Sequence, residues 1–304
     1  MKLGTLRHNG PDKLVARLDE ARALDLFQAS GGAPDVADMH SMIAGGQGAL
    51  DHARALIDAP LAGAVIEIAQ AAFRMPLHPV QCRDCLVFEE HLLNSFAQAE
   101  AMTGRTFAVP EVWYEQPIFY KGNRMSFIGH GQDVRWPHYR DHLDLELAIV
   151  LGKGGTDIQA DRAAEHVWGY TILNDVSARD AQMREMAGQL GPAEGKDFDT
   201  GNILGPWVVT ADEIARPAAL NMEVHVTGDR WGGGNSRDMH DDFGAILAHV
   251  SAAETLYPDE VIGSGTVGTG CGLETGRRLS DGGETALTIE GIGTLRNTVR
   301  WAIP

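Results

Sequence analysis

The chain has few cysteines and few basic residues for its length, and these two shortages exclude several classes of protein. The three cysteines in 304 residues, Cys82, Cys85 and Cys271, cannot build a disulfide framework and fit a reducing compartment. Cys82 and Cys85 have CxxC spacing, but no second cysteine pair or nearby histidine completes a zinc site. Basic residues number 25 against 42 acidic ones, which gives a net charge of −17. We therefore expect no nucleic-acid partner, because an acidic surface repels a phosphate backbone.

Long apolar runs are missing as well. No uninterrupted stretch approaches the roughly 20 residues of a membrane span, and residues 1–8 lack the apolar segment of a signal peptide. We expect no membrane association and a cytoplasmic location. A hydrophobic content of 44% still supports a real core. Prolines near residue 76 interrupt the pattern, so we expect a small N-terminal domain over residues 1–75 and a main domain over residues 76–304.

Hydrophobic periodicity separates the chain into a helical and a β-rich part. It predicts helices over residues 14–27, 49–57 and 62–73, and a longer amphipathic helix over residues 83–102. Beyond residue 110, turns are frequent and apolar runs are short, which is typical of strands. The predicted strands cover residues 113–120, 143–151, 169–174, 206–210, 222–227 and 285–289, and a further helix is expected over residues 239–257. The expected fold class is α+β, mainly β.

Two acidic residues interrupt the most apolar of these strands. Asp144 and Glu146 stand two residues apart in the run from Leu143 to Leu151, and side chains at i and i+2 of a strand point to the same face. If that face is buried, the two carboxylates repel each other, and a cation between them removes the conflict. Ligands that are all oxygen favour a hard ion such as Mg²⁺ or Ca²⁺. The alternative is an edge strand on which both carboxylates face solvent.

Three further residues extend this acidic pair if they come close to it. Asp175 follows an apolar strand and is either a third carboxylate or a helix cap. Arg179 and Gln182 share one face of a helix and could contact a ligand together, if the segment is helical. We leave the cap and the ligand site as alternatives.

Polar groups suited to catalysis or ligand binding occur in three further stretches of the chain. Asp84 and His91 are seven residues apart, so they share a face of the helix predicted there. An imidazole, with an ordinary pKa near 6.5, is a credible general base beside a metal. Lys196 could hold a carboxylate or a developing enolate, or be a solvated loop residue. The Gly- and Thr-rich residues 263–270 would let backbone N–H groups approach a small polar ligand.

The motifs of this chain, and their order along it, resemble those of the fumarylacetoacetate hydrolase family. The resemblance covers roughly residues 76–304. It rests on Asp84…His91, Pro117–Tyr120, Asp144-Leu145-Glu146, Asn174–Gln182, Gly195-Lys196, Gly205–Trp207, Gly265-Thr266 and Ile289–Asn297. It implies a mixed β-sandwich roll with a small N-terminal domain, in a homodimer.

The resemblance also implies roles for individual residues. The implied metal ligands are Asp84, Asp144, Glu146 and Asp175, and the metal is expected to be Mg²⁺, with Mn²⁺ or Ca²⁺ as alternatives. His91 matches the catalytic base, and Glu274 matches the carboxylate that orients it. The implied substrate or oxyanion contacts are Tyr120, Arg179, Gln182, Lys196 and Thr266. Asp144 departs from the family, which usually has Glu there; the shorter side chain could lengthen the contact, insert a water or alter the metal preference.

Hydrolysis of a carbon–carbon bond is the reaction that this resemblance implies first. The substrate would be a small anionic 1,3-dicarbonyl acid, such as an acylpyruvate or a fumarylacetoacetate-like acid. A lyase or isomerase is the alternative: a decarboxylase, dehydratase or tautomerase acting on a 2-oxo acid or a 2-oxo-3-deoxy sugar acid through a metal-bound enolate. A non-catalytic protein that binds a small acid or a metal is a third reading.

Overall fold

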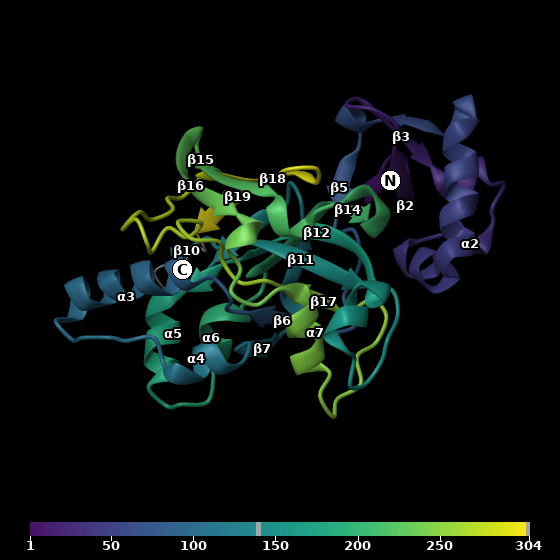
Figure 1. The fold of residues 1–304 in the computed structure, drawn as a ribbon. Helices are drawn as coiled ribbons and strands as arrows, with labels where there is room; N and C mark the ends of the chain where they lie inside the picture. Colours follow the sequence, from purple (N-terminus) through teal and green to yellow (C-terminus); the bar gives the residue numbers. More distant parts are fainter. Residues whose placement is uncertain (138–140, 302–304) are drawn as a thin grey trace.

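The structure, a computed structural model, describes residues 1–137 and 141–301, and two β-sheets dominate it (Figure 1). The larger sheet has the strand order β4 (Val65–Glu67), β3 (Arg22–Asp25), β2 (Asp12–Arg17), β1 (Lys2–Arg7), β14 (Asn202–Thr210), β12 (Val167–Asp175), β11 (Leu145–Leu151), β17 (Val261–Gly263), β6 (Cys82–Cys85) and β7 (Phe119–Gly122); β5 (Ala72–Arg74) pairs with β1, and β8 (Phe127–Gly129) with β14. The smaller sheet has the order β16 (Asp229–Asn235), β15 (Asn221–Val226), β18 (Glu284–Ile289), β19 (Gly293–Trp301) and β9 (Asp133–Trp136).

Short elements surround these sheets. The helices are α1 (Leu26–Ala29), α2 (Met39–Asp58), α3 (Glu89–Thr103), α4 (Glu111–Glu115), α5 (Arg179–Met186), α6 (Ala193–Lys196) and α7 (Phe243–Val250), and β10 (Asp141–His142) pairs with β13 (Ser177–Ala178). Parallel pairs, such as β17 with β6 and β19 with β9, occur beside antiparallel ones. The predicted α+β fold with mixed sheets is confirmed. No helix among the described residues is long and apolar enough to cross a membrane.

The central strand β11 shows how the two faces of the large sheet differ. All seven of its residues are buried. Leu145, Leu147, Ile149 and Leu151 belong to the core shared with the small sheet, whereas Ala148 and Val150 belong to the core shared with residues of the N-terminal segment. This alternation follows from the two-residue repeat of a strand. Even-numbered positions of β11 therefore face away from the small sheet.

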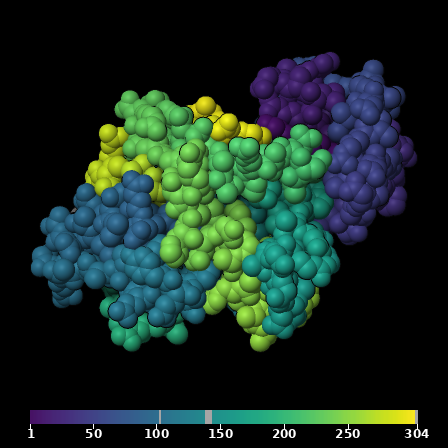
Figure 2. Space-filling model, viewed as in Figure 1, coloured from purple at the N-terminus to yellow at the C-terminus, as the bar shows by residue number. Residues whose placement is uncertain are grey.

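The N-terminal part of the chain lies at one side of the molecule, purple at the upper right of Figure 2. The helices predicted over residues 14–27 and 62–73 are wrong: residues 12–17 and 22–25 are strands, and the other segment contains the short strands β4 and β5. Leu14, Val15 and Ala16 are all buried, and a run of apolar residues without alternation is compatible with either structure. The helix predicted over residues 49–57 lies within α2. Strand β1 pairs with β14, so the large sheet continues into the main part of the chain, and the boundary at residue 75 stays a prediction.

The helix predicted over residues 83–102 is confirmed from Glu89 onward, and its first part is wrong. Residues 82–85 form β6, which pairs with β17 on one side and β7 on the other, and α3 begins at Glu89. The buried guanidinium of Arg83 makes this polar strand possible, because Glu254 and Glu260 bind it at 2.6 and 3.1 Å. Cys82 and Cys85 are buried and belong to different core clusters, and burial raises the pKa of both thiols.

Other predictions in the second half of the chain hold better. Five predicted strands correspond to β11, β12, β14, β15 and β18. Residues 113–120 are instead divided between α4 and β7, and the helix expected over residues 239–257 is only as long as α7. Of these strands, β11, β12 and β14 are buried along almost their whole length, whereas buried and exposed residues alternate in β15.

Candidate metal and acid–base site

Three carboxylates from distant parts of the chain meet at one end of the large sheet. Asp84 lies near the end of β6, Glu146 near the start of β11, and Asp175 at the end of β12. Their ligand oxygens lie within 4.8 Å of one another, and all three residues are buried. Strand β17 lies between β6 and β11 and pairs with both, so the strand order brings the three side chains together. We call Asp84, Glu146 and Asp175 the carboxylate cluster.

Two glycines make room for this cluster. A Cβ atom at Gly263 would lie 2.6 Å from Asp84 Oδ1 and 2.6 Å from Glu146 Oε2, so a side chain there would displace both carboxylates. Gly265 has φ +81°, in the left-handed region that favours glycine, and its N–H donates to Glu146 Oε2 at 3.2 Å. The Gly-rich segment therefore brings a backbone N–H close to a carboxylate.

The electrostatics of the carboxylate cluster fit a bound cation. Burial and the neighbouring charges of Asp84 and Asp175 raise the pKa of Glu146 well above its usual value. Burial raises the pKa of Asp175 to about 8, although Lys196 opposes the change. Neither Oδ1 of Asp84 nor Oδ1 of Asp175 receives a hydrogen bond from the described residues. Buried oxygens that repel one another and lack donors are suitable ligands for a hard divalent ion.

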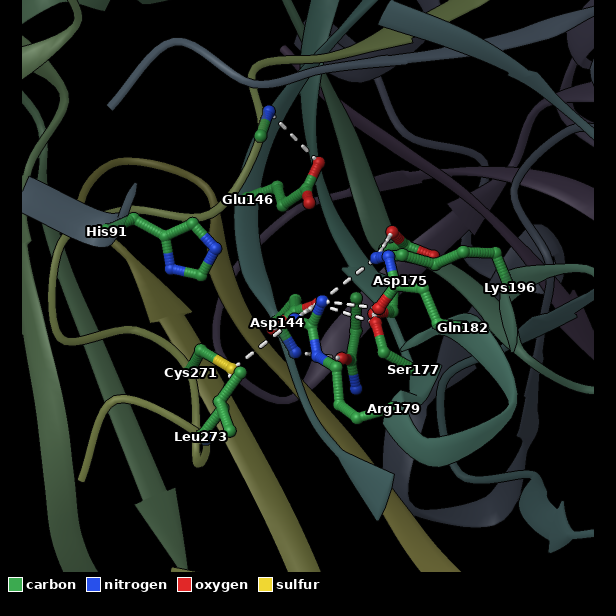
Figure 3. Close-up of polar contacts among 12 residues, drawn as sticks. His91, Asp144, Glu146, Asp175, Ser177, Arg179, Gln182, Lys196, Cys271 and Leu273 are labelled. Atoms are coloured by element: carbon green, nitrogen blue, oxygen red, sulfur yellow. Dashed lines mark hydrogen bonds and ion pairs between the residues drawn. The ribbon is translucent and has the colours of Figure 1, made fainter. Parts of the chain in front are cut away.

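Asp144, the fourth ligand that the resemblance implies, does not belong to the carboxylate cluster. Figure 3 shows it beside Arg179 and Ser177. Its oxygens accept hydrogen bonds from Arg179 Nη2 at 2.6 and 2.8 Å, from Ser177 Oγ at 2.7 Å and from Lys196 Nζ at 3.2 Å. Burial alone would raise the pKa of Asp144, but Arg179 and Lys196 hold it well below its usual range. Asp144 and Glu146 are at most 1% exposed, so the alternative of a solvent-facing pair is wrong.

The substrate contacts that the resemblance implies lie around these four acids. Tyr120 is opposite Asp84 in the β6–β7 pair, and its hydroxyl donates to Asp175 Oδ2 at 3.1 Å. Lys196 Nζ forms an ion pair with Asp175. Arg179 Nη1 donates to Gln182 Oε1 at 2.8 Å within α5. The helix-cap alternative for Asp175 is wrong, because Asp175 belongs to β12 and α5 has no side-chain cap. Thr266 is buried directly after Gly265.

His91 and Glu274 form a buried pair beside these residues. His91 Nδ1 lies 2.8 Å from Glu274 Oε1, and Figure 3 shows the imidazole pointing toward the side where Asp144 and Glu146 lie. His91 and Asp84 do not share a helix, because residues 86–88 separate β6 from α3. That connection is held by the indole of Trp113, which donates to the Leu86 carbonyl at 2.6 Å.

Sequence reasoning missed two polar residues of the site. Ser177 donates to Asp144, and Asn94 Nδ2 donates to Glu274 Oε2 at 3.0 Å. Asn94 comes one helical turn after His91, and that spacing is the signal that could have identified it. Ser177 has no such signal, because its partner Asp144 lies 33 residues away in the sequence.

Sequence comparisons match this chain to a family profile and to curated proteins. A family profile described as "Fumarylacetoacetate (FAA) hydrolase C-terminal" matches residues 90–300. Oxaloacetate tautomerase YisK of Bacillus subtilis is 34% identical over 189 residues, 61% of this chain and 62% of that protein. Protein Rv2993c of Mycobacterium tuberculosis is 38% identical over 186 residues, 60% of this chain and 66% of that protein. The matches thus span slightly less than two thirds of these relatives.

Solved structures of similar fold cover the whole chain. A 5-carboxymethyl-2-hydroxymuconate delta-isomerase of Mycobacterium smegmatis has a TM-score of 0.72 at 26% identity and covers 99% of this chain and 100% of that one. A maleylpyruvate hydrolase of Sphingobium sp. SYK-6, in complex with manganese(II) ion and pyruvate, has a TM-score of 0.76 at 23% identity and covers 100% of both chains, and it shows the fold alone. The family profile matches residues 90–300, which are more than two thirds of this chain, so the chain belongs to the fumarylacetoacetate hydrolase family.

Proposed function

We propose that this protein is a metal-dependent hydrolase that cleaves a carbon–carbon bond in a small 1,3-dicarbonyl acid of the acylpyruvate type. One observation carries the proposal. The ligand oxygens of the buried carboxylate cluster lie within 4.8 Å of one another, and the buried pair of His91 and Glu274 lies beside the cluster. Asp84, Glu146 and Asp175 would hold the divalent ion, with Mg²⁺ as the first expectation. When bound, the ion would supply Lewis-acid polarisation of carbonyl oxygens.

The residues of the chain would share the remaining tasks. Glu274 would accept a hydrogen bond from His91 Nδ1–H, which leaves Nε2 free to take a proton from water. Arg179 and Lys196 place positive charge beside the carboxylate cluster, where it can bind an acid group or stabilise a developing oxyanion. In the structure both cations are paired with Asp144, so the acidic groups of the site already orient them. Tyr120 and Gln182 add polar contacts at the same place.

A second candidate function is a tautomerase, isomerase or lyase acting on a 2-oxo acid. It is favoured by the relatives, because the 34% identical protein is an oxaloacetate tautomerase and a 26% identical structure is a delta-isomerase. These reactions also need an enolate next to a cation, so the carboxylate cluster suits them equally. The feature that favours hydrolysis is the His91–Glu274 pair, because activation of water requires a base.

One assay separates the two functions. The protein would be incubated with Mg²⁺ or Mn²⁺ and a panel of acylpyruvates, oxaloacetate and 2-oxo-3-deoxy sugar acids. Two acid products that appear together support the hydrolase; keto–enol exchange, loss of CO₂ or loss of water without cleavage supports the alternative. No turnover of any compound, with the metal bound, would contradict both.

The expected homodimer also stays a prediction, which light scattering of the purified protein tests.

A further inference from the structure

Helix α3 contacts Glu274 through more than its histidine. His91, Asn94 and Gln98 are three and four residues apart, so they lie on one face of the helix. His91 Nδ1 and Asn94 Nδ2 contact the two carboxylate oxygens at 2.8 and 3.0 Å, and Gln98 Nε2 donates only to the backbone carbonyl of Glu274 at 3.4 Å. The Glu274 side chain is 1% exposed, so water does not replace these partners.

Each oxygen of Glu274 has two partners. Oε1 contacts His91 Nδ1 and accepts from the Cys271 N–H at 3.2 Å, whereas Oε2 accepts from Asn94 Nδ2 and from the Thr269 N–H at 2.7 Å. An ionised carboxylate only accepts hydrogen bonds, so the contact between His91 Nδ1 and Oε1 is a hydrogen bond when Nδ1 carries a proton. Two of the four partners are backbone amides of the chain segment that carries Glu274 itself.

Asn94 has a distinct place among these donors. It connects the carboxylate to the helix that carries the imidazole, and it binds the oxygen that His91 does not reach. The backbone amides of Cys271 and Thr269 hold the carboxylate relative to its own chain segment. His91 and Asn94 contact one oxygen each, so the two together fix both ends of the carboxylate relative to α3.

We propose that Asn94 is a positioning residue: its amide fixes the Glu274 carboxylate so that His91 keeps its proton on Nδ1 and presents Nε2 as the base. The consequence for catalysis rests on the proposed function, but the positioning does not. A structural role alone, in which Asn94 only anchors the segment around Glu274, predicts no difference between Asn94 and Gln98 when each is replaced.

The direct test is the NMR signal of the His91 Nδ1 proton in the full-length protein, identified by its loss in His91→Gln. In Asn94→Leu, which keeps the volume but removes the donor, we expect this signal to move and its exchange with water to become about tenfold faster or more, as when a hydrogen bond to a charged group is lost. In the matched control Gln98→Leu, signal and exchange should stay as in the wild type. Asn94→Asp serves in the same test if the leucine variant does not fold.

Two results would overturn the positioning role: an unchanged signal in the Asn94 variants, or an equal change in the Gln98 control. The kinetic readout is separate. With a substrate from the panel above, Asn94→Leu should lower kcat by about tenfold or more while KM and the Mn²⁺ dissociation constant stay within about twofold. If the wild type turns over none of the compounds, the proposed function fails, and the NMR comparison still decides the role of Asn94.

Discussion

Without a metal ion, the protein should lose stability as the pH rises from 7 to 8. The group responsible is Asp175, whose pKa burial raises to about 8, against 3.8 for an ordinary aspartate. Over this range the unfolded chain has released this proton, whereas the folded chain still holds most of it at pH 7 and half of it at pH 8. The folded state therefore binds more protons, and its stability falls with pH.

The linkage relation gives the size of the effect. For a folded pKa of about 8, the contribution of Asp175 falls by about 1 kcal/mol between pH 7 and pH 8. That loss lowers Tm by roughly 2 °C in a protein of this size. Glu146, whose pKa is also raised, acts in the same direction. His130 does not interfere, because burial lowers its pKa to about 4 and it is neutral throughout this range.

The assay is thermal unfolding at pH 7 and pH 8 in the presence of a chelator. Asp175→Asn is the control, since it keeps the shape of the side chain but cannot titrate, so its Tm should change less with pH. Saturating Mg²⁺ should raise Tm more at pH 8 than at pH 7, because binding to the carboxylates releases protons. A metal-free Tm that stays constant or rises from pH 7 to pH 8 in the wild type would refute the reasoning.

Three further predictions concern single residues of the site. His91→Ala should leave metal binding intact and slow turnover about 10²-fold or more, as expected for loss of a general base; unchanged kcat would contradict the assignment. Gly263→Ala should weaken Mn²⁺ binding measured by calorimetry, because its Cβ would lie 2.6 Å from oxygens of two of the three carboxylates, and wild-type affinity would contradict the geometry. Trp113→Phe removes the indole donor to the Leu86 carbonyl and should lower the free energy of unfolding by about 1 kcal/mol in denaturant titrations; no loss would show that water replaces the donor.

The central part of the fold could be predicted from local sequence because its strands are long and apolar. The run around Glu146 indicates a buried strand, and the structure has one there. The N-terminal strands were mistaken for helices, since Leu14, Val15 and Ala16 are buried in succession and give no two-residue alternation. Apolar composition alone does not distinguish a strand covered on both faces from a helix.

The site was predictable only where the relevant signal is local. Strand β6 looks too polar to be buried, and Arg83 is stable there because acidic partners more than 170 residues away bind it. The position of Asp144 likewise depends on long-range pairing: the cations of Arg179 and Lys196 bind it, and no local pattern indicates that. For Glu274, which comes next to His91 from 183 residues away, only the family resemblance indicates the pairing.

Calorimetric titration of Mn²⁺ into the metal-free protein tests the central claim most directly. The account predicts one ion per chain in the wild type and in His91→Ala, and an affinity at least about 100-fold lower in Glu146→Gln, because the amide removes a charged ligand from the carboxylate cluster. Wild-type affinity in Glu146→Gln, or no binding of Mn²⁺ by the wild type at all, would contradict it.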